Sequence, residues 1–283
     1  MELKYPEKPG CKKTPHFEIN SGYKINGTAK SWVGFFDLVW VKAKLNLKAE
    51  ASKNHLKQAW WILEPLMYMS VFYLIFGVLL QRGGEGFIPF LLTGLIPFQW
   101  FAKSVQQASN SIVAGRGIIH KVKIYPLFFP LVAILQVFGK QMLVFIMLVI
   151  FLFFFDLPPN VYWFGLVPVM MTQLLLLFVV GAAVAILIPF VRDLSYLVTT
   201  GIQFTMFLSG VFYSVEKIPQ EWHATFFVNP VANILFQYRR ILINQEWPDW
   251  SMLGILVAAL FVSAILVVLL YEKLGPKLPR VLV

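Results

Sequence analysis

The chain carries no residue pattern for binding or hydrolysing ATP. A nucleotide-binding loop needs an earlier glycine followed by Gly-Lys-Ser or Gly-Lys-Thr, so that backbone N–H groups surround the phosphates. The one Gly-Lys pair, Gly139-Lys140, is followed by Gln141 and stands in an apolar stretch without that earlier glycine. The apolar stretches also contain no Ser/His/Asp arrangement and no pair of carboxylates. We therefore predict that the chain is not an enzyme and carries no cofactor of its own.

The sequence supports neither a metal site nor a disulfide. Its single cysteine, Cys11, cannot form a disulfide within one chain. The four histidines are scattered, and none stands at the spacing of metal ligands. They are His16, His55, His120 and His223. We expect no metal site.

Three ionisable side chains stand inside stretches that are apolar enough to cross a membrane. Glu64 is one turn into the first stretch, Lys103 is near the cytoplasmic end of the second, and Lys140 is about 20 Å into the third. A charge in lipid is costly unless it is paired or hydrated, so each is a candidate functional group. Structural alternatives remain open: a basic partner for Glu64, snorkelling for Lys103 and an interhelix bond for Lys140.

Two stripes of polar and aromatic residues run along predicted helices. Both follow the three-and-four spacing that places residues on one face of an α-helix. The first comprises Trp61, Glu64, Tyr68 and Phe72, and the second comprises Tyr196, Thr200, Gln203, Phe207 and Gly210. Contact with lipid needs no polar side chains, so a stripe suits either a seam between helices or the wall of a conduit. We take both stripes except Gly210, together with Lys140, as candidates for a substrate path.

The composition indicates that much of the chain faces lipid. It is 58% hydrophobic and 13% charged, about half the charged fraction of soluble proteins. A soluble core of 283 residues could not absorb so much apolar surface. The net charge of +10 does not indicate a nucleic-acid partner, because most Lys and Arg flank apolar stretches or precede residue 58. Aromatic residues make up 16% and present flat faces past which sugar rings could move.

Six stretches reach the ~20 apolar residues that a spanning helix requires. They are 61–81, 87–112, 127–155, 161–189, 195–213 and 251–271. Counted over alternate loops, 18 Lys and Arg fall on one side and 4 on the other. Basic residues accumulate on the cytoplasmic side, so both termini are expected in the cytoplasm. The expected fold is an all-α integral membrane protein with six transmembrane helices.

The segments around these stretches have their own patterns. Residues 1–29 are expected to form a flexible cytoplasmic arm, 30–57 an amphipathic helix on the membrane surface, and 273–283 a cytoplasmic tail. No cleavable signal peptide is visible, because the first apolar stretch begins too late. The domain between them, 58–272, holds the six predicted spans.

The segment 214–250 lies between the last two predicted spans. Prolines interrupt it too often for a spanning helix, so we expect two short re-entrant helices. Asn229 would cap the second helix, and Pro230 would occupy its first position. An amphipathic surface loop is the alternative.

Several short motifs follow one another along the chain in a specific order and spacing. They are Gln58-Ala-Trp60-Trp61-Ile-Leu-Glu64-Pro65, Asn110-Ser-Ile, Ile118-Ile119-His120-Lys121-Val122 with Pro126 and Pro130, Phe190-Val-Arg192-Asp193, Ser209-Gly-Val-Phe-Tyr213 with Ile218-Pro219, Asn229-Pro230 and Tyr238-Arg239. Together they resemble the permease subunit of type-2 ABC exporters, in the branch that exports lipid-linked polysaccharides such as O-antigen, capsule or teichoic acid. The resemblance covers roughly residues 35–272, and one departure is Ser209-Gly210, where the family often has Ser-Pro.

The resemblance implies a homodimer of permeases on two copies of an ATPase subunit that binds ATP and Mg²⁺, in the bacterial inner membrane. It implies that a lipid-linked glycan moves from cytoplasm to periplasm, with membrane lipids but no nucleic acid as further partners. The amphipathic helix and the loop 113–126 would contact the ATPase. The candidates for that contact are Arg116, His120, Lys121, Lys123, Arg192 and Asp193. The candidates for the periplasmic exit are Asn229, Pro230, Tyr238 and Arg239.

Three other functions remain open. A permease of the same family could carry a drug, haem or lipid. An ion-coupled secondary transporter would need acidic residues deep in several spans, and the sequence offers essentially Glu64 alone. A membrane enzyme acting on lipid-linked sugar would need clustered periplasmic carboxylates. The carboxylates available there are Glu216, Glu221, Glu246 and Asp249, whose pattern is typical of a solvated rim.

Overall fold

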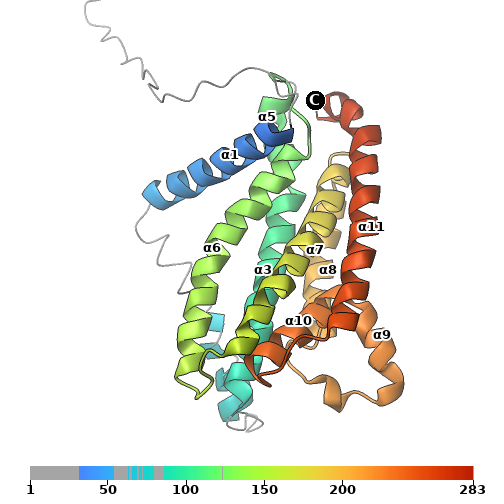
Figure 1. Ribbon diagram of the computed structural model, residues 1–283. Coiled ribbons are helices and arrows are strands. Elements are labelled where there is room, and N and C mark those ends of the chain that lie inside the picture. Colours follow the sequence, from blue (N-terminus) through green and yellow to red (C-terminus); the bar gives the residue numbers. More distant parts are fainter. Residues whose placement is uncertain are drawn as a thin grey trace, which may run out of the picture.

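The computed structural model describes residues 32–53, 63, 66–68, 70, 71, 73–79, 86–122 and 124–282 (Figure 1). The regular structure in these ranges is helical throughout. Several predictions fall outside the described residues. They are the arm 1–29 with Cys11, the end of the amphipathic helix after residue 53, Trp61, Glu64, Phe72 and Lys123.

Each of the five apolar stretches predicted from residue 87 onward contains a helix. These helices are α3 (Phe87–Ser109), α6 (Phe128–Phe153), α7 (Leu166–Leu187), α8 (Leu194–Leu208) and α11 (Trp250–Leu274). Among the described residues, three helical segments are long and apolar enough to cross a membrane: Phe128–Phe153, Val161–Leu187 and Trp250–Val281. This confirms a helical, multi-pass membrane protein. The total of six spans stays a prediction, because 61–81 is described only in part.

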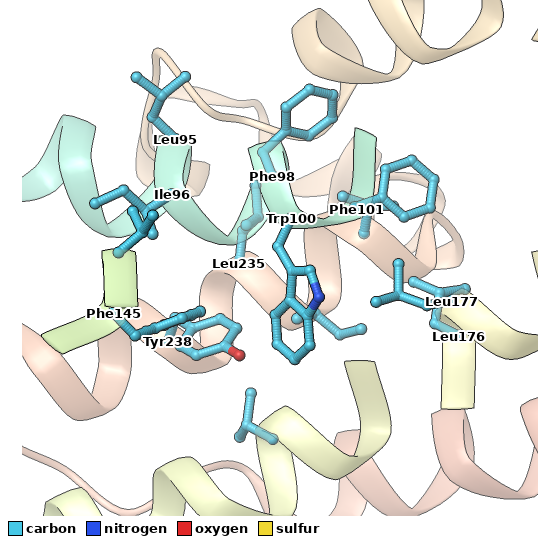
Figure 2. Packing of buried hydrophobic residues seen from close by; sticks show 14 of the residues in the cluster. Leu95, Ile96, Phe98, Trp100, Phe101, Phe145, Leu176, Leu177, Leu235 and Tyr238 are labelled. Carbon is cyan, nitrogen blue, oxygen red and sulfur yellow. The ribbon is translucent and has the colours of Figure 1, made fainter. Parts of the chain in front are cut away.

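Helix α3 is the centre of the bundle. Its residues from Leu91 to Phe101 are buried on every side, as expected for a helix that is apolar all round. Trp100 is fully buried, and its indole packs against the rings of Phe138 and Phe145 on α6. Figure 2 shows Trp100 between the aromatic pair Phe145 and Tyr238 on one side and Leu176 and Leu177 on the other.

A proline interrupts this central helix, and two glutamines bind beside it. Pro97 has no N–H and breaks the backbone hydrogen-bond ladder of α3. The Gln141 amide of α6 donates to the Ile96 carbonyl at 3.1 Å, and the Gln173 amide of α7 donates to the Pro97 carbonyl at 2.8 Å. The Tyr238 hydroxyl donates to the Gln173 side-chain oxygen at 2.8 Å. These polar bonds join four helices inside an apolar core.

Helix α1 (Trp32–Lys53) crosses α6 near the end of the bundle that carries α5 (Figure 1). The predicted apolar face of this helix is divided. Val39 and Ala43 are buried, whereas Phe36 and Trp40 are 57% and 58% exposed. The exposed aromatic pair supports the predicted position on a membrane surface, which remains a prediction.

The predicted tail at this same end is largely helical, and the loop 113–126 contains short helical turns. These turns are the end of α4 (Ser111–Ala114) and α5 (Arg116–Ile119). The chain continues after α11 into α12 (Leu278–Val281), where Leu278 is fully buried. The Tyr271 hydroxyl donates to the Ala182 carbonyl at 2.9 Å and joins α11 to α7.

The predicted pair of short helices is present at the opposite end. They are α9 (His223–Val228) and α10 (Pro230–Leu242), and α10 packs against α3 and α7. The Asn229 side chain caps α10 by accepting from the N–H groups of Val231 and Ala232, and Pro230 occupies the first turn as predicted. Whether α9 and α10 enter the membrane stays a prediction.

The placement of Gly210 on the face of the fifth span is wrong. Helix α8 ends at Leu208, five residues before the predicted boundary. Gly210 has a φ of +69°, a left-handed conformation that glycine adopts without steric cost and that cannot continue an α-helix. The chain therefore turns after Ser209 toward α9.

We expect the Gln173→Leu substitution to destabilise the bundle, because it leaves the Tyr238 hydroxyl and the Pro97 carbonyl without this partner. Two interhelix bonds inside a membrane protein are together worth about 1–3 kcal/mol. Thermal unfolding of the purified protein in detergent measures the effect. Ser263→Ala is the control, because the Ser263 hydroxyl bonds only to the Ala259 carbonyl of its own helix. Equal midpoints for the two variants would contradict the role of Gln173.

Candidate functional site

A cavity of about 590 Å³ lies between α3, α6, α8 and Tyr68, which precedes the π-helix Tyr73–Leu79. Most of its exposed wall surface is apolar, with residues such as Leu95, Phe98 and Val144. The smaller polar part is rich in amides. The glutamines are Gln99, Gln106, Gln107, Gln141 and Gln203, and they are joined by Tyr68, Lys103, Lys140 and Thr199.

The polar side of the cavity originates mainly from one face of α3. Gln99, Lys103, Gln106 and Gln107 follow one another at intervals that place them over neighbouring turns of the helix. The Gln106 amide donates to the Thr199 hydroxyl of α8 at 3.1 Å and links the two helices across the cavity. Sequence reasoning missed these glutamines because it considered charged residues within the second span, and glutamine has no charge. The helical spacing of these polar residues within 87–112 was the signal that could have identified them.

Lys140 forms the interhelix bond that the sequence left open, and its role in a substrate path stays a prediction. Its ammonium group forms an ion pair with the Glu50 carboxylate of α1, with an N–O distance of 2.7 Å, so the interhelix bond is present. The Gln136 amide donates to the same carboxylate at 2.9 Å. Lys140 also lines the cavity. The pair is only one-fifth exposed, so solvent screens it less than a surface pair.

The predicted path residues separate into two groups. Tyr68, Lys140 and Gln203 line the cavity. Tyr196, Thr200 and Phe207 do not, and they are exposed on α8, Tyr196 to 75%. No residue of α8 is buried, so this stripe does not form a tight seam within the described part of the chain. For this stripe, a contact with a second copy of the chain and a place along a conduit stay as the two predictions.

The predicted ATPase-contact residues that the structure describes, all but Lys123, gather at the end of the bundle that carries α5. Arg116 and Arg192 line one cavity of about 270 Å³, together with Asn110 and Leu282. The side chains of His120, Lys121 and Asp193 are exposed. The arrangement brings exposed positive charge to one end of the molecule, next to the last described residues of the chain.

The predicted exit residues hold the opposite end together. The Asn229 amide donates to the Ser209 hydroxyl at 2.9 Å. The buried Arg239 guanidinium donates to the carbonyls of Gly210 and Val211 at 2.7 and 2.9 Å. It also stacks over the Phe90 ring at 3.6 Å, a favourable cation–π contact. Arg239 therefore joins α10 to the turn after α8 and to the start of α3.

A glycine on α3 makes room for this arginine. A Cβ atom at Gly94 would clash with the Arg239 guanidinium and would lie 3.4 Å from the Val211 carbonyl. Tyr238, the neighbour of Arg239, is also fully buried. Both side chains lie in the interior, so their function in the described arrangement is to position α10, and direct contact with a substrate stays a prediction.

Comparison with known proteins gives one family and consistent relatives. The family model described as "ABC-2 type transporter" matches residues 39–243. An O-antigen export system permease protein RfbA of Klebsiella pneumoniae is 26% identical over 249 residues, which cover 87% of this chain and 95% of the relative. A second Klebsiella pneumoniae protein of that name is 27% identical over 74% of this chain and 81% of its own length. One from Myxococcus xanthus is 26% identical over 75% and 82%, respectively.

We expect the Arg239→Gln substitution to loosen the turn after α8. The carbonyls of Gly210 and Val211 would lose charged donors, at a cost of about 1–3 kcal/mol. Hydrogen–deuterium exchange should then accelerate in residues 209–213 and in α10. Arg240→Gln is the matched control, because the adjacent Arg240 makes a partly exposed ion pair with Glu246 that is worth less than about 1 kcal/mol. Similar exchange in both variants would show that Arg239 does not hold this region.

Proposed function

Because the chain belongs to the ABC-2 type transporter family, we propose that it is the permease subunit of an exporter for a lipid-linked surface glycan such as O-antigen. The names of the relatives support the substrate class, since all three are O-antigen export permeases. The structural observation that carries the proposal is the glutamine-lined cavity between α3, α6 and α8.

The chemistry of this cavity suits a glycan. Each glutamine amide offers both donors and acceptors, so it can bond to sugar hydroxyls in many orientations. Phe98 and Tyr68 add flat apolar faces, which suit the C–H faces of sugar rings. The volume is within the range of small-ligand sites, about 300–1,000 Å³. The cavity therefore fits a short section of glycan at a time, and a polymer would pass in steps.

The same cavity argues against an ion-coupled carrier. Such a carrier needs carboxylates that take up and release ions within the membrane. Among the described residues that line the cavity, the charged groups are Lys103 and Lys140, and both are cationic. An anionic or neutral polar substrate matches this wall better than a cation does.

Transport would require a second copy of the chain. Six helices scarcely enclose a path as wide as a sugar, whereas twelve can do so. Helix α8 supports this arrangement, because its apolar residues remain at least partly exposed within one chain. The exposed stripe of Tyr196, Thr200 and Phe207 would then face the partner copy or the path between the copies.

Energy would come from two ATPase subunits at the cytoplasmic face, where ATP and Mg²⁺ bind. The end of the bundle that carries α5 supports this contact, because it presents Arg116, Lys121 and Arg192 beside α12. The same end would be cytoplasmic, with both termini there, since Lys and Arg accumulate on that side. The protein would lie in the inner membrane with α9 and α10 at the periplasmic exit.

Replacement of two cavity glutamines tests the substrate path. We expect Gln99→Leu/Gln203→Leu to lower the amount of surface glycan about thirtyfold, since each lost amide bond is worth about 1 kcal/mol and about 1.4 kcal/mol is a factor of ten. Lipid-linked glycan should accumulate inside the cell, as it should after deletion of the gene. Gln220→Leu is the control, because Gln220 is exposed on a short turn far from the cavity. Normal surface glycan in the double variant would remove the cavity from the path, and normal surface glycan in the deletion strain would refute the proposed function.

Charge reversal tests the contact with the ATPase. We expect Arg116→Glu/Lys121→Glu to lose export and to co-purify with less ATPase, because like charges across an interface repel. Lys217→Glu changes an exposed lysine at the opposite end and should behave as the wild type. Quantitative co-purification and surface-glycan staining measure both effects. Export that survives the double reversal would assign the contact to another surface.

A further inference from the structure

Lys140 is the place where the surface helix α1 meets the wall of the cavity. The Glu50 carboxylate of α1 lies 2.7–2.8 Å from the Lys140 ammonium group. Lys140 is also one of the residues that line the cavity, together with Gln141 and Val144. One residue thus binds α1 through its ammonium group and borders the cavity.

The contacts around this ion pair hold α1 against α6 next to Lys140. Gln136 donates to Glu50 at 2.9 Å and accepts from Asn46 at 3.4 Å. One residue before Lys140, a Cβ atom at Gly139 would come within 2.8 Å of a Leu47 methyl group, so α1 lies directly against α6 there. Displacement of α1 from α6 would therefore separate Glu50 from Lys140.

Electrostatics indicates what the lysine would bind after such a separation. A partly buried ammonium group requires an anion or several acceptors. The cavity is also lined by a second lysine, Lys103, and by the amide side chains of Gln107 and Gln203. Ammonium and amide donors together match the oxygens of a phosphate. A glycan attached to a lipid carrier has such a phosphate at its linkage, next to an apolar chain and a sugar.

We propose that the cavity binds the phosphate linkage of the lipid-linked glycan and that Glu50 competes with this phosphate for Lys140. The proposal rests on the proposed function and deepens it. Phosphate binding would weaken the hold of Glu50 on Lys140 and release α1 from α6. By thermodynamic reciprocity, an ATPase-driven displacement of α1 would raise the affinity of the cavity for phosphate by the same factor.

A purely structural ion pair makes different predictions from a competing one. If Glu50 and Lys140 only hold α1 on α6, exchanging their positions keeps the attraction and preserves function. If Lys140 also binds phosphate, the exchange places a carboxylate on the cavity wall, which repels phosphate. The double variant Glu50→Lys/Lys140→Glu therefore separates the two roles.

The test measures binding to the full chain in lipid nanodiscs. One probe is a polyprenyl diphosphate that carries a single hexose, and the second is the same polyprenyl hexoside without phosphate. We expect the wild type to bind the diphosphate at least about tenfold more tightly than the second probe. Lys140→Gln and the exchanged pair should lose this preference, and Glu50→Gln should strengthen it severalfold. Lys48→Gln alters an exposed lysine on the same helix and should match the wild type.

Several results would overturn the proposal. They are a wild type without phosphate preference, an exchanged pair that binds the diphosphate as the wild type does, and a Glu50→Gln variant with unchanged or weaker binding. If Lys140→Gln fails to fold, Lys140→Arg and Glu50→Gln decide: both should keep the preference, and only Glu50→Gln should strengthen it. Loss of the phosphate preference with intact export would refute this inference and leave the proposed function standing.

Discussion

The structure depends on two side-chain hydrogen bonds at a break in its central helix, α3. Pro97 interrupts the backbone ladder of α3, and the amides of Gln141 and Gln173 bond to the carbonyls beside it. In an apolar interior the buried side-chain amides of Gln141 and Gln173 need protein partners, so these bonds fix α6 and α7 against α3 in one register. Tyr238 extends the same connection to α10 through Gln173.

A fixed α3 determines what both ends of the molecule can do. After Pro97 along the chain, the polar face of α3 places Gln99 and Gln106 on the wall of the cavity. At its start, Gly94 leaves space for Arg239, which holds the turn after α8. The end with α9 and α10 is thus held by a buried charge, whereas the end with α5 carries exposed charges. A rigid centre between an anchored end and a charged, accessible end suits a subunit that is driven from one side.

The sequence alone predicted the features that depend on the length of apolar stretches and on local chemistry such as helix capping. Apolar stretches predicted the five helices from residue 87 onward, and Asn229-Pro230 predicted the start of α10 because capping is local. The cavity could not be predicted, since it requires α3, α6 and α8 to be neighbours. The Glu50–Lys140 pair joins residues that are far apart in the chain. The sequence therefore predicted an interhelix bond as one role of Lys140 but could not identify Glu50 as its partner. The early end of α8 escaped notice because Gly210 is compatible with an apolar helix by composition.

Site-specific photo-crosslinking during export measures most directly whether the polar face of α3 contacts the substrate. A photoreactive residue at position 106 would face the cavity, and one at position 255 would lie on the exposed side of α11. The account predicts that position 106 forms adducts with the lipid-linked glycan in cells that export it, and that position 255 forms none. Export without adducts at position 106, or equal adducts at both positions, would contradict it.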